Sequence, residues 1–448
     1  MHESIRLANA GLELHIAPAT TTIRLINSAT GSAWILDPAT MLADTSGQTN
    51  PLFGPAGTGH LPHWASTDTN HTFQLTIFRC EQLGTNGALL TLRGSGGDLV
   101  TRWELRADGL EITALAGVST VKAFTLPGAF RPAAGPNTMI APICQGIVHR
   151  GTGLPFSFNI IRNGHAGWSM PFVALIGERD ALLQIAVTEH DARLWLAKTA
   201  AGTLNAVWIQ DPSRGAMRYD RTVRLCFTAP TPAAAAMAYR NHIRQNGHLK
   251  TWDAKIAERP NLEKLFGAVM CFIGYCQDDQ IDYAANFRKL KAMGVDKAFV
   301  YPLSMGNLVE SFKMGGRDPI DIRQHLGVLD ELGYLAASWM WVEDVPADST
   351  GNLLLNSRGE PHFSWQIDSV KWYKSCPVRG VALANHIQNE RMSGHNAQHF
   401  DVTASRIGLE CFHPDHPLDR RDDALWRRRI LETSFSKGNV VSSEGFWG

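Results

Sequence analysis

Carboxylate side chains are the groups in this chain best suited to chemistry, because several of them stand where predicted strands end. Asp401 and Glu444 follow the last two of five predicted strands. Neighbouring parallel strands lie about 4.8 Å apart, so carboxylates at adjacent strand tips can come within roughly 5 Å of each other. A retaining glycosidase uses this spacing, with one carboxylate as nucleophile and the other as acid/base. On position alone, an equally good interpretation is that these carboxylates are structural and either pair with arginines or cap the next helix.

The second half of the chain has the pattern needed to position these groups. From about residue 264, apolar runs without clean alternation are separated by helical patterns, two of which stop at Gly294 and Gly333. Such runs indicate strands that are buried on both faces of a parallel sheet. The predicted strands are 265–275, 297–301, 334–342, 398–402 and 439–443, and the predicted helices are 283–293, 322–332, 378–392 and 418–435. This βα repeat predicts a (β/α)8-type barrel or a doubly wound sheet.

The first half of the chain has a different pattern. Residues 1–230 contain short runs of alternating apolar residues, with turn signals such as Asp108-Gly109 between them, and predict an antiparallel β-sandwich. Pro232 begins an alanine-rich run that predicts a helix. The expected organisation is a β-sandwich accessory domain at 1–230, a linker helix at 231–262 and a catalytic barrel at 263–448. Since only five barrel strands are expected, we also expect the barrel to be incomplete at its C-terminal side; a five-stranded open sheet is the alternative.

Composition excludes several classes of partner. The 448 residues include 42 Lys and Arg and 42 Asp and Glu, so the net charge is zero and no basic patch for nucleic acid is expected. No apolar run approaches the roughly 20 residues of a membrane helix, and the first residues lack the apolar stretch of a signal peptide. A cytoplasmic protein is therefore expected. Its seven cysteines predict reduced, buried thiols, and Cys271 and Cys276 lack a second pair at zinc spacing. The oligomeric state is not indicated.

Further polar and aromatic residues near the predicted strand ends are candidates for binding substrate. Sugar rings stack their C–H faces on indoles, and one tryptophan lies in a loop that is too polar for a core. His416 and Arg420, which lie around the start of the last predicted helix, are expected near the tip of the fourth strand. The predicted substrate-binding residues are Tyr301, Glu343, Asp344, Trp365, His416 and Arg420.

The C-terminal motifs resemble those of a known enzyme family. The segments are His399-Phe400-Asp401-Val402-Thr403-Ala404, Glu410-Cys411, His413-Pro414-Asp415-His416-Pro417-Leu418 with Arg420, and Ser442-Ser443-Glu444-Gly445. They are similar to glycoside hydrolase family 129, whose α-N-acetylgalactosaminidase-type enzymes are related to the endo-acting family 101. The match is strongest over residues 400–448. The resemblance implies that Asp401 is the nucleophile and Glu444 the acid/base, and that the sandwich is a supersandwich of the galactose-mutarotase type.

The resulting hypothesis is a retaining glycoside hydrolase that cleaves α-linked N-acetylgalactosamine, or a related sugar, from glycans or glycopeptides. Glu444 is expected to have the higher pKa, because Phe446 and Trp447 follow it, and Asp401 is expected to be ionised. The alternatives are a carbohydrate-binding protein without catalysis on the same scaffold and an inactive fragment of the enzyme. No cofactor and no metal site are predicted. A metal-dependent hydrolase or a structural calcium ion would draw its ligands from Asp278, Asp279, Glu343 and Asp344.

Overall fold

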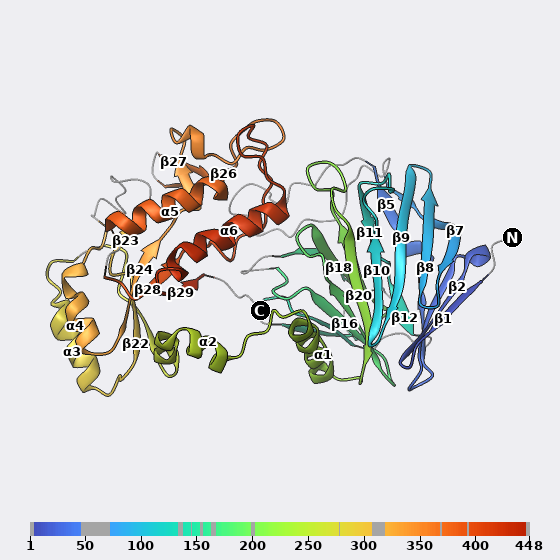
Figure 1. Ribbon diagram of the computed structural model, residues 1–448, viewed down its shortest axis with the longest axis horizontal. Helices are drawn as coiled ribbons and strands as arrows, with labels where there is room; N and C mark the ends of the chain where they lie inside the picture. The colour runs from blue at the N-terminus through green and yellow to red at the C-terminus, as the bar shows by residue number, and fades with distance from the viewer. Residues whose placement is uncertain are drawn as a thin grey trace. The chain divides into compact units, whose positions relative to one another are not determined.

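The computed structural model (Figure 1) describes residues 4–45, 72–132, 138–144, 146–152, 156–162, 167–198, 202–276, 278–306, 319–367, 370–391 and 394–444. The chain divides into two compact units, residues 1–248 and residues 249–447. Within the described ranges, no helix combines the length and the apolar character needed to cross a membrane. Phe446 and Trp447, which are expected from the sequence to raise the pKa of Glu444, lie outside these ranges.

The first unit consists of antiparallel sheets. A five-stranded sheet has the order β1–β2–β3–β4–β12 (Ile5–Ala8, Leu12–Ala17, Thr22–Asn27, Ala33–Leu36, Phe130–Pro132). A nine-stranded sheet has the order β14–β13–β16–β17–β20–β10–β9–β8–β7 (Ile147–Arg150, Thr138–Ala141, Phe172–Ile176, Ala181–Ala186, Arg221–Thr228, Gly109–Ala114, Gly97–Arg106, Gly87–Gly94, Thr76–Leu83). A six-stranded sheet has the order β15–β18–β19–β11–β5–β6 (Phe156–Ile161, Ala192–Lys198, Leu204–Gln210, Ala123–Thr125, Leu42–Asp44, Thr72–Gln74). Short 3-10 helices η1 (Pro18–Thr20) and η2 (Pro38–Thr40) lie between strands.

One large apolar core holds these sheets together. Along β2 and β9, buried positions alternate with more exposed ones, as the alternating sequence pattern requires. The core includes the fully buried Trp34, Trp168 and Trp208. Helix α1 (Pro232–Gln245) lies beside β16 (Figure 1) and also contacts β17 and β20. Tyr239 of this helix stacks on Phe172 with ring centroids 4.7 Å apart. The predicted antiparallel β character of this half agrees with the structure.

The second unit is built on a parallel sheet. Its strands β21 (Val269–Phe272), β22 (Ala298–Tyr301), β24 (Leu335–Met340), β28 (Ala397–Phe400) and β29 (Val440–Ser443) are neighbours in the order of the sequence. The short β23 (Met305–Gly306) also pairs with β24. A doubly wound sheet reverses its strand order, whereas a strictly sequential order is that of part of an α/β barrel. The closed eight-stranded barrel remains a prediction.

Helices alternate with the parallel strands, and α2, α3 and α6 begin at a side chain that caps them. The second unit contains α2 (Trp252–Glu258), η4 (Pro260–Leu265), α3 (Tyr283–Ala292), η5 (Arg323–His325), α4 (Leu326–Glu331), α5 (Pro377–Arg391) and α6 (Arg420–Phe435). Asp419 caps α6 by accepting from the Asp422 N–H, and the Asp422 carboxylate accepts from the Asp419 N–H in return. α5 and α6 lie side by side over β28, and Ile387 and Ile430 pack with Phe400 (Figure 1).

The main departure from the sequence prediction lies between β24 and α5. A small antiparallel sheet of order β25–β27–β26 (Asp344–Pro346, Val370–Lys374, Phe363–Ile367) occupies this connection, with η6 (Thr350–Asn352) beside it. No strand is predicted here from the sequence, and each of the three strands is short and partly polar. The predicted linker helix forms two helices, α1 and α2. The first parallel strand is only four residues long, and η4 ends shortly before it.

Candidate active site

The register of the last two strands brings Asp401 and Glu444 together. Phe400 of β28 pairs with Ser443 of β29, so the two acidic residues follow at neighbouring strand tips. The Asp401 N–H donates to the Met340 carbonyl at 2.8 Å, and the Glu444 N–H donates to the Phe400 carbonyl at 3.4 Å. The parallel pairing therefore continues to the two carboxyl-bearing residues themselves.

The carboxyl groups of Asp401 and Glu444 are hydrogen-bonded to each other. Burial, followed by this hydrogen bond and the negative charge of Glu444, raises the pKa of Asp401 to about 8. Two carboxyl groups in contact cannot both be ionised without strong repulsion, so the pair holds one proton at neutral pH. The pKa of Asp401 in the ligand-free protein is therefore shifted upward, opposite to the direction that an ionised nucleophile requires.

The backbone directly after Asp401 is strained. Val402 has a φ of +46°, in the left-handed region that β-branched residues avoid. Its carbonyl accepts hydrogen bonds from the N–H groups of Ser405 and Arg406, each at 3.0 Å. Strain of this kind costs about 1–3 kcal/mol and persists only where the surrounding contacts enforce it. Here these contacts fix the direction in which the chain leaves Asp401.

Aromatic rings and a neutral histidine surround the carboxyl pair. Tyr301 stacks on Trp339 with centroids 5.9 Å apart, and the His399 ring lies 4.7 Å from the Trp339 ring. Burial lowers the pKa of His399 to about 4, so this imidazole is neutral at pH 7, and its Nδ1 lies 2.9 Å from the Ser442 hydroxyl. Burial also raises the pKa of Tyr275 and Tyr301, and the nearby carboxylates add to it. These side chains add no formal charge to the site.

A buried ion pair lies next to the carboxyl pair. Lys374 Nζ is 2.8 Å from an Asp344 carboxylate oxygen, and Trp341 Nε1 donates to the other oxygen at 2.9 Å. The negative charge of Asp344 raises the pKa of Asp401, and the positive charge of Lys374 lowers it. The charge of Asp344, which lies on the small sheet of β25, β26 and β27, thus raises the pKa of the candidate nucleophile Asp401.

Three tryptophans extend this part of the site. Trp341 and Trp365 have ring centroids 5.0 Å apart, and Trp365 stacks on Trp372 at 5.2 Å with an interplanar angle of 2°. Trp341 and Trp372 are buried, whereas Trp365 is half-buried. Trp365 therefore offers part of its surface to a ligand, on a platform stiffened by the other two rings.

The structure divides the sequence-predicted residues into two groups. Asp401, Glu444, Asp344, Tyr301 and Trp365 belong to one electrostatic and aromatic neighbourhood.

The other three predicted residues make separate contacts. Glu343 is buried against Arg406, which also binds Asp423 at 2.7 Å. Arg420 lies 3.6 Å from Glu410, and the His416 ring faces Cys411. These contacts organise the segment that follows Asp401.

The carboxylates considered as metal ligands do not gather in the described part of the chain. Within it, the one group of three histidine, cysteine, aspartate or glutamate side chains arranged to hold an ion consists of Cys376, Cys411 and His416. Glu343 and Asp344 already face cations in buried pairs, and Asp278 accepts a hydrogen bond from the Gln280 N–H.

Sequence reasoning missed Tyr275, His399 and Lys374. His399 could have been found, because residues two apart on a strand point to the same face and His399 precedes Asp401 by two positions. Lys374 belongs to the inserted sheet, and no local pattern in the sequence links it to the strand tips.

Comparisons with known proteins place this architecture among glycosidases. No known family profile and no curated protein sequence matches the chain significantly. Among solved structures, it is similar to the α-N-acetylgalactosaminidase NagBb from Bifidobacterium bifidum in complex with GalNAc, with a TM-score of 0.78, 16% identity, and coverage of 98% of this chain and 76% of that one. The complex of the same enzyme with Gal-NHAc-DNJ gives a TM-score of 0.77 at 17% identity, with coverage of 98% and 76%.

A more distant similarity is to a sulfoquinovosidase of family GH31 from E. rectale, with a TM-score of 0.56 at 8% identity and coverage of 99% of this chain and 67% of that one. At these identities the comparisons show the fold alone. The chain therefore shares its fold with these glycosidases.

Proposed function

We propose that the protein is a retaining glycoside hydrolase acting on α-linked N-acetylgalactosamine or a closely related sugar. The observation that carries the proposal is the hydrogen-bonded pair of Asp401 and Glu444 at adjacent strand tips. Inverting enzymes separate their carboxyl groups by about 6.5–9.5 Å to accommodate a water molecule. Two carboxyl groups in direct contact leave no such space, which supports the retaining reaction.

The proposed reaction uses the single proton of the pair. When the sugar binds, positive charge developing at the anomeric carbon stabilises ionised Asp401, and the proton passes along the hydrogen bond to Glu444. Asp401 then attacks the anomeric carbon, and Glu444 protonates the leaving oxygen. In the second step Glu444 takes a proton from water, and the water oxygen displaces Asp401 from the glycosyl-enzyme.

The surrounding residues fit this chemistry. His399, Tyr275 and Tyr301 lie near the pair without adding formal charge, so the buried Asp401 interacts with the developing positive charge with little screening. Trp365 offers a stacking surface for an apolar sugar face. The choice of sugar rests on the similarity to NagBb, whose structures are described as complexes with GalNAc and Gal-NHAc-DNJ.

The test measures hydrolysis of aryl α-N-acetylgalactosaminides by the wild type and by Asp401→Asn and Glu444→Gln. Asp401→Asn should lower kcat/KM on the order of 10⁴-fold, which corresponds to about 5 kcal/mol of transition-state stabilisation. Glu444→Gln should retain activity on substrates with good leaving groups, and added azide should give the α-glycosyl azide. Proton NMR should detect the α-anomer as the first product.

Exposed residues provide matched controls. Asp348→Asn and Glu432→Gln make the same chemical changes at exposed positions of the same unit and should leave kcat/KM within about twofold. Activity of Asp401→Asn within about tenfold of wild type, or a β-anomer as first product, would reject the proposed roles. Binding of the sugar without any turnover by the wild type would instead identify a carbohydrate-binding protein.

A further inference from the structure

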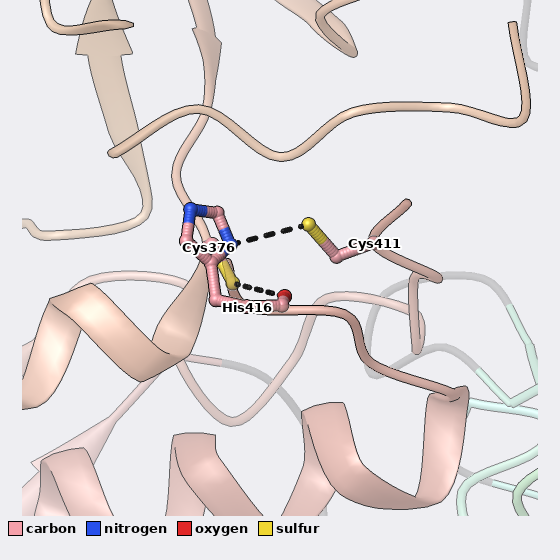
Figure 2. Close-up of side chains that lie close together, drawn as sticks. All are labelled: Cys376, Cys411 and His416. Atoms are coloured by element: carbon pink, nitrogen blue, oxygen red, sulfur yellow. Dashed lines mark hydrogen bonds between the residues drawn. The ribbon is translucent and has the colours of Figure 1, made fainter. Parts of the chain in front are cut away.

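Two thiols and an imidazole meet in the interior of the second unit. The candidate ligand atoms of Cys376, Cys411 and His416 all lie within 4.8 Å of one another, and Figure 2 shows the His416 ring facing the Cys411 sulfur. The residues are 0%, 0% and 4% exposed, respectively. None of them takes part in the reaction proposed above. The sequence prediction considered only Cys271 and Cys276, because Cys376 and Cys411 are too far apart in the chain to form a short zinc motif.

Three separate segments build this cluster. Cys376 directly precedes α5, and its N–H donates to the Asn352 carbonyl at 2.7 Å. Cys411 pairs with Leu418 through two backbone hydrogen bonds of 3.0 and 2.9 Å, which close the loop that carries His416. The Phe412 N–H donates to the Leu355 carbonyl at 2.9 Å. The backbone thus holds the cluster from outside, independently of the three side chains.

Backbone N–H groups are directed at both sulfurs of the cluster. The backbone N–H of Val378 donates to the Cys376 sulfur, and those of Leu355 and His413 donate to the Cys411 sulfur. Cys376 also lies at the N-terminus of α5, where the helix dipole stabilises negative charge. Backbone donors directed at both sulfurs are the arrangement in which outer-shell hydrogen bonds support metal-bound thiolates.

The distances match a tetrahedral zinc site. Zinc binds cysteine sulfur at about 2.3 Å and histidine nitrogen at about 2.0–2.1 Å, so a tetrahedral site separates sulfur from nitrogen by about 3.5 Å. His416 Nδ1 lies 3.5 Å from Cys411 Sγ. His416 Nε2 is buried and has no hydrogen-bond partner in the described part of the chain, and the ring is positioned by stacking on His413 at 3.9 Å and by the contact of its Nδ1 with the Cys411 sulfur.

The charge balance favours a divalent ion. Leu354, Leu418 and the partly buried Val378, Leu409 and Trp426 pack around the two cysteines. An apolar shell of this kind makes an uncompensated charge costly. Two thiolates and Zn²⁺ sum to zero, whereas two thiolates and Cu⁺ leave a negative charge. Sulfur and imidazole ligands suit zinc and do not suit calcium or magnesium.

We propose that Cys376, Cys411 and His416 bind one structural Zn²⁺, with a small exogenous ligand such as water in the fourth position. The ion joins the start of α5 to the 411–418 loop, which lies between the strand of Asp401 and α6. Binding replaces two thiol protons by zinc and releases them to solvent. The proposal does not depend on the glycosidase assignment, because its primary readout is metal content.

The test measures zinc in the full chain purified with reductant and without chelator. Inductively coupled plasma mass spectrometry should find about one zinc per chain, and a chelator should lower the Tm of the wild type. The single variants Cys411→Ser and His416→Gln should reduce bound zinc about tenfold or more. Cobalt exchanged into the wild type should give a thiolate-to-cobalt charge-transfer band and the intense d–d bands of tetrahedral coordination.

Cys226→Ser is the matched control, since Cys226 is a buried thiol of the first unit. It should leave zinc content and the cobalt spectrum unchanged. The proposal is overturned if wild type supplied with zinc chloride holds no stoichiometric metal, or if Cys411→Ser and Cys226→Ser hold equal amounts. It is also overturned if mass spectrometry finds a Cys376–Cys411 disulfide in protein prepared without reductant and reduction does not restore zinc binding. Because chelation is applied to the wild type, misfolding of a variant cannot decide the outcome.

Discussion

Replacing Asp401 by asparagine should change how the stability of the protein depends on pH. The pKa of Asp401 is raised to about 8 in the folded protein, mainly by burial and by its hydrogen bond to Glu444. In the unfolded chain an aspartate titrates near 3.9. Between these values the folded state holds a proton that the unfolded state has lost, so wild-type stability falls as pH rises through this window. Asparagine resembles the protonated carboxyl in shape and does not titrate.

The size of the effect follows from the pKa difference. One pH unit within the window changes the free energy of unfolding by at most about 1.4 kcal/mol, so the ceiling between pH 5 and pH 8 is about 4 kcal/mol. Because Glu444 is exposed and shares the proton, we expect about half of this value, roughly 2 kcal/mol. In a unit of about 200 residues, 2 kcal/mol corresponds to about 4–8 °C in Tm.

The assay compares thermal unfolding of the full-length wild type and Asp401→Asn at pH 5, 6, 7 and 8. The Tm of the variant minus that of the wild type should increase steadily with pH. Asp348→Asn, at an exposed position, should show a constant difference near zero. A difference that is independent of pH, or one that decreases as pH rises, would refute the reasoning, since it would mean that Asp401 is ionised in the folded protein and stabilised by Lys374.

Three further predictions concern activity and stability. The kcat/KM of the wild type should fall above pH about 8, as the Asp401 pair loses its proton, and a pH–rate profile that is flat to pH 9.5 would contradict this. Arg406→Met leaves the buried Glu343 without a cation and Asp423 with Arg427 alone, and should cost about 3–5 kcal/mol in urea unfolding, whereas Arg428→Met at an exposed pair should cost under about 0.5 kcal/mol. Trp365→Ala should raise KM about tenfold with a smaller change in kcat. The control Trp252→Ala, at an exposed position outside the aromatic cluster, should change neither KM nor kcat. If the two variants have equal kinetics, Trp365 does not stack on the substrate.

The order of the parallel strands was predictable, because apolar runs alternate with helical patterns, two of which stop at Gly294 and Gly333. The tips of these strands could therefore be located, and the neighbouring positions of Asp401 and Glu444 follow from the sequential order of β28 and β29. The inserted sheet of β25, β26 and β27 was not predictable, since its strands are short, partly polar and stabilised by packing of Trp365 and Trp372.

Protonation and long-range clustering were beyond sequence reasoning. The position of the proton in the carboxyl pair depends on burial and on Asp344 and Lys374, which approach from the inserted sheet. Likewise, Cys376 and Cys411 lie on different segments, and only the fold brings them together. Glu343 was predicted to bind substrate because it lies at a strand end, but the buried Arg406, 63 positions away in sequence, binds it instead.

The most direct test of the central claim is to trap the proposed glycosyl-enzyme. Full-length protein is incubated with a fluorinated N-acetylgalactosaminyl analogue that carries a good leaving group, digested, and mapped by mass spectrometry. The account predicts one sugar per chain, attached through an ester to Asp401, and no label in Asp401→Asn. A label on Glu444, or turnover of the unmodified substrate with no covalent intermediate and inverted product, would contradict it.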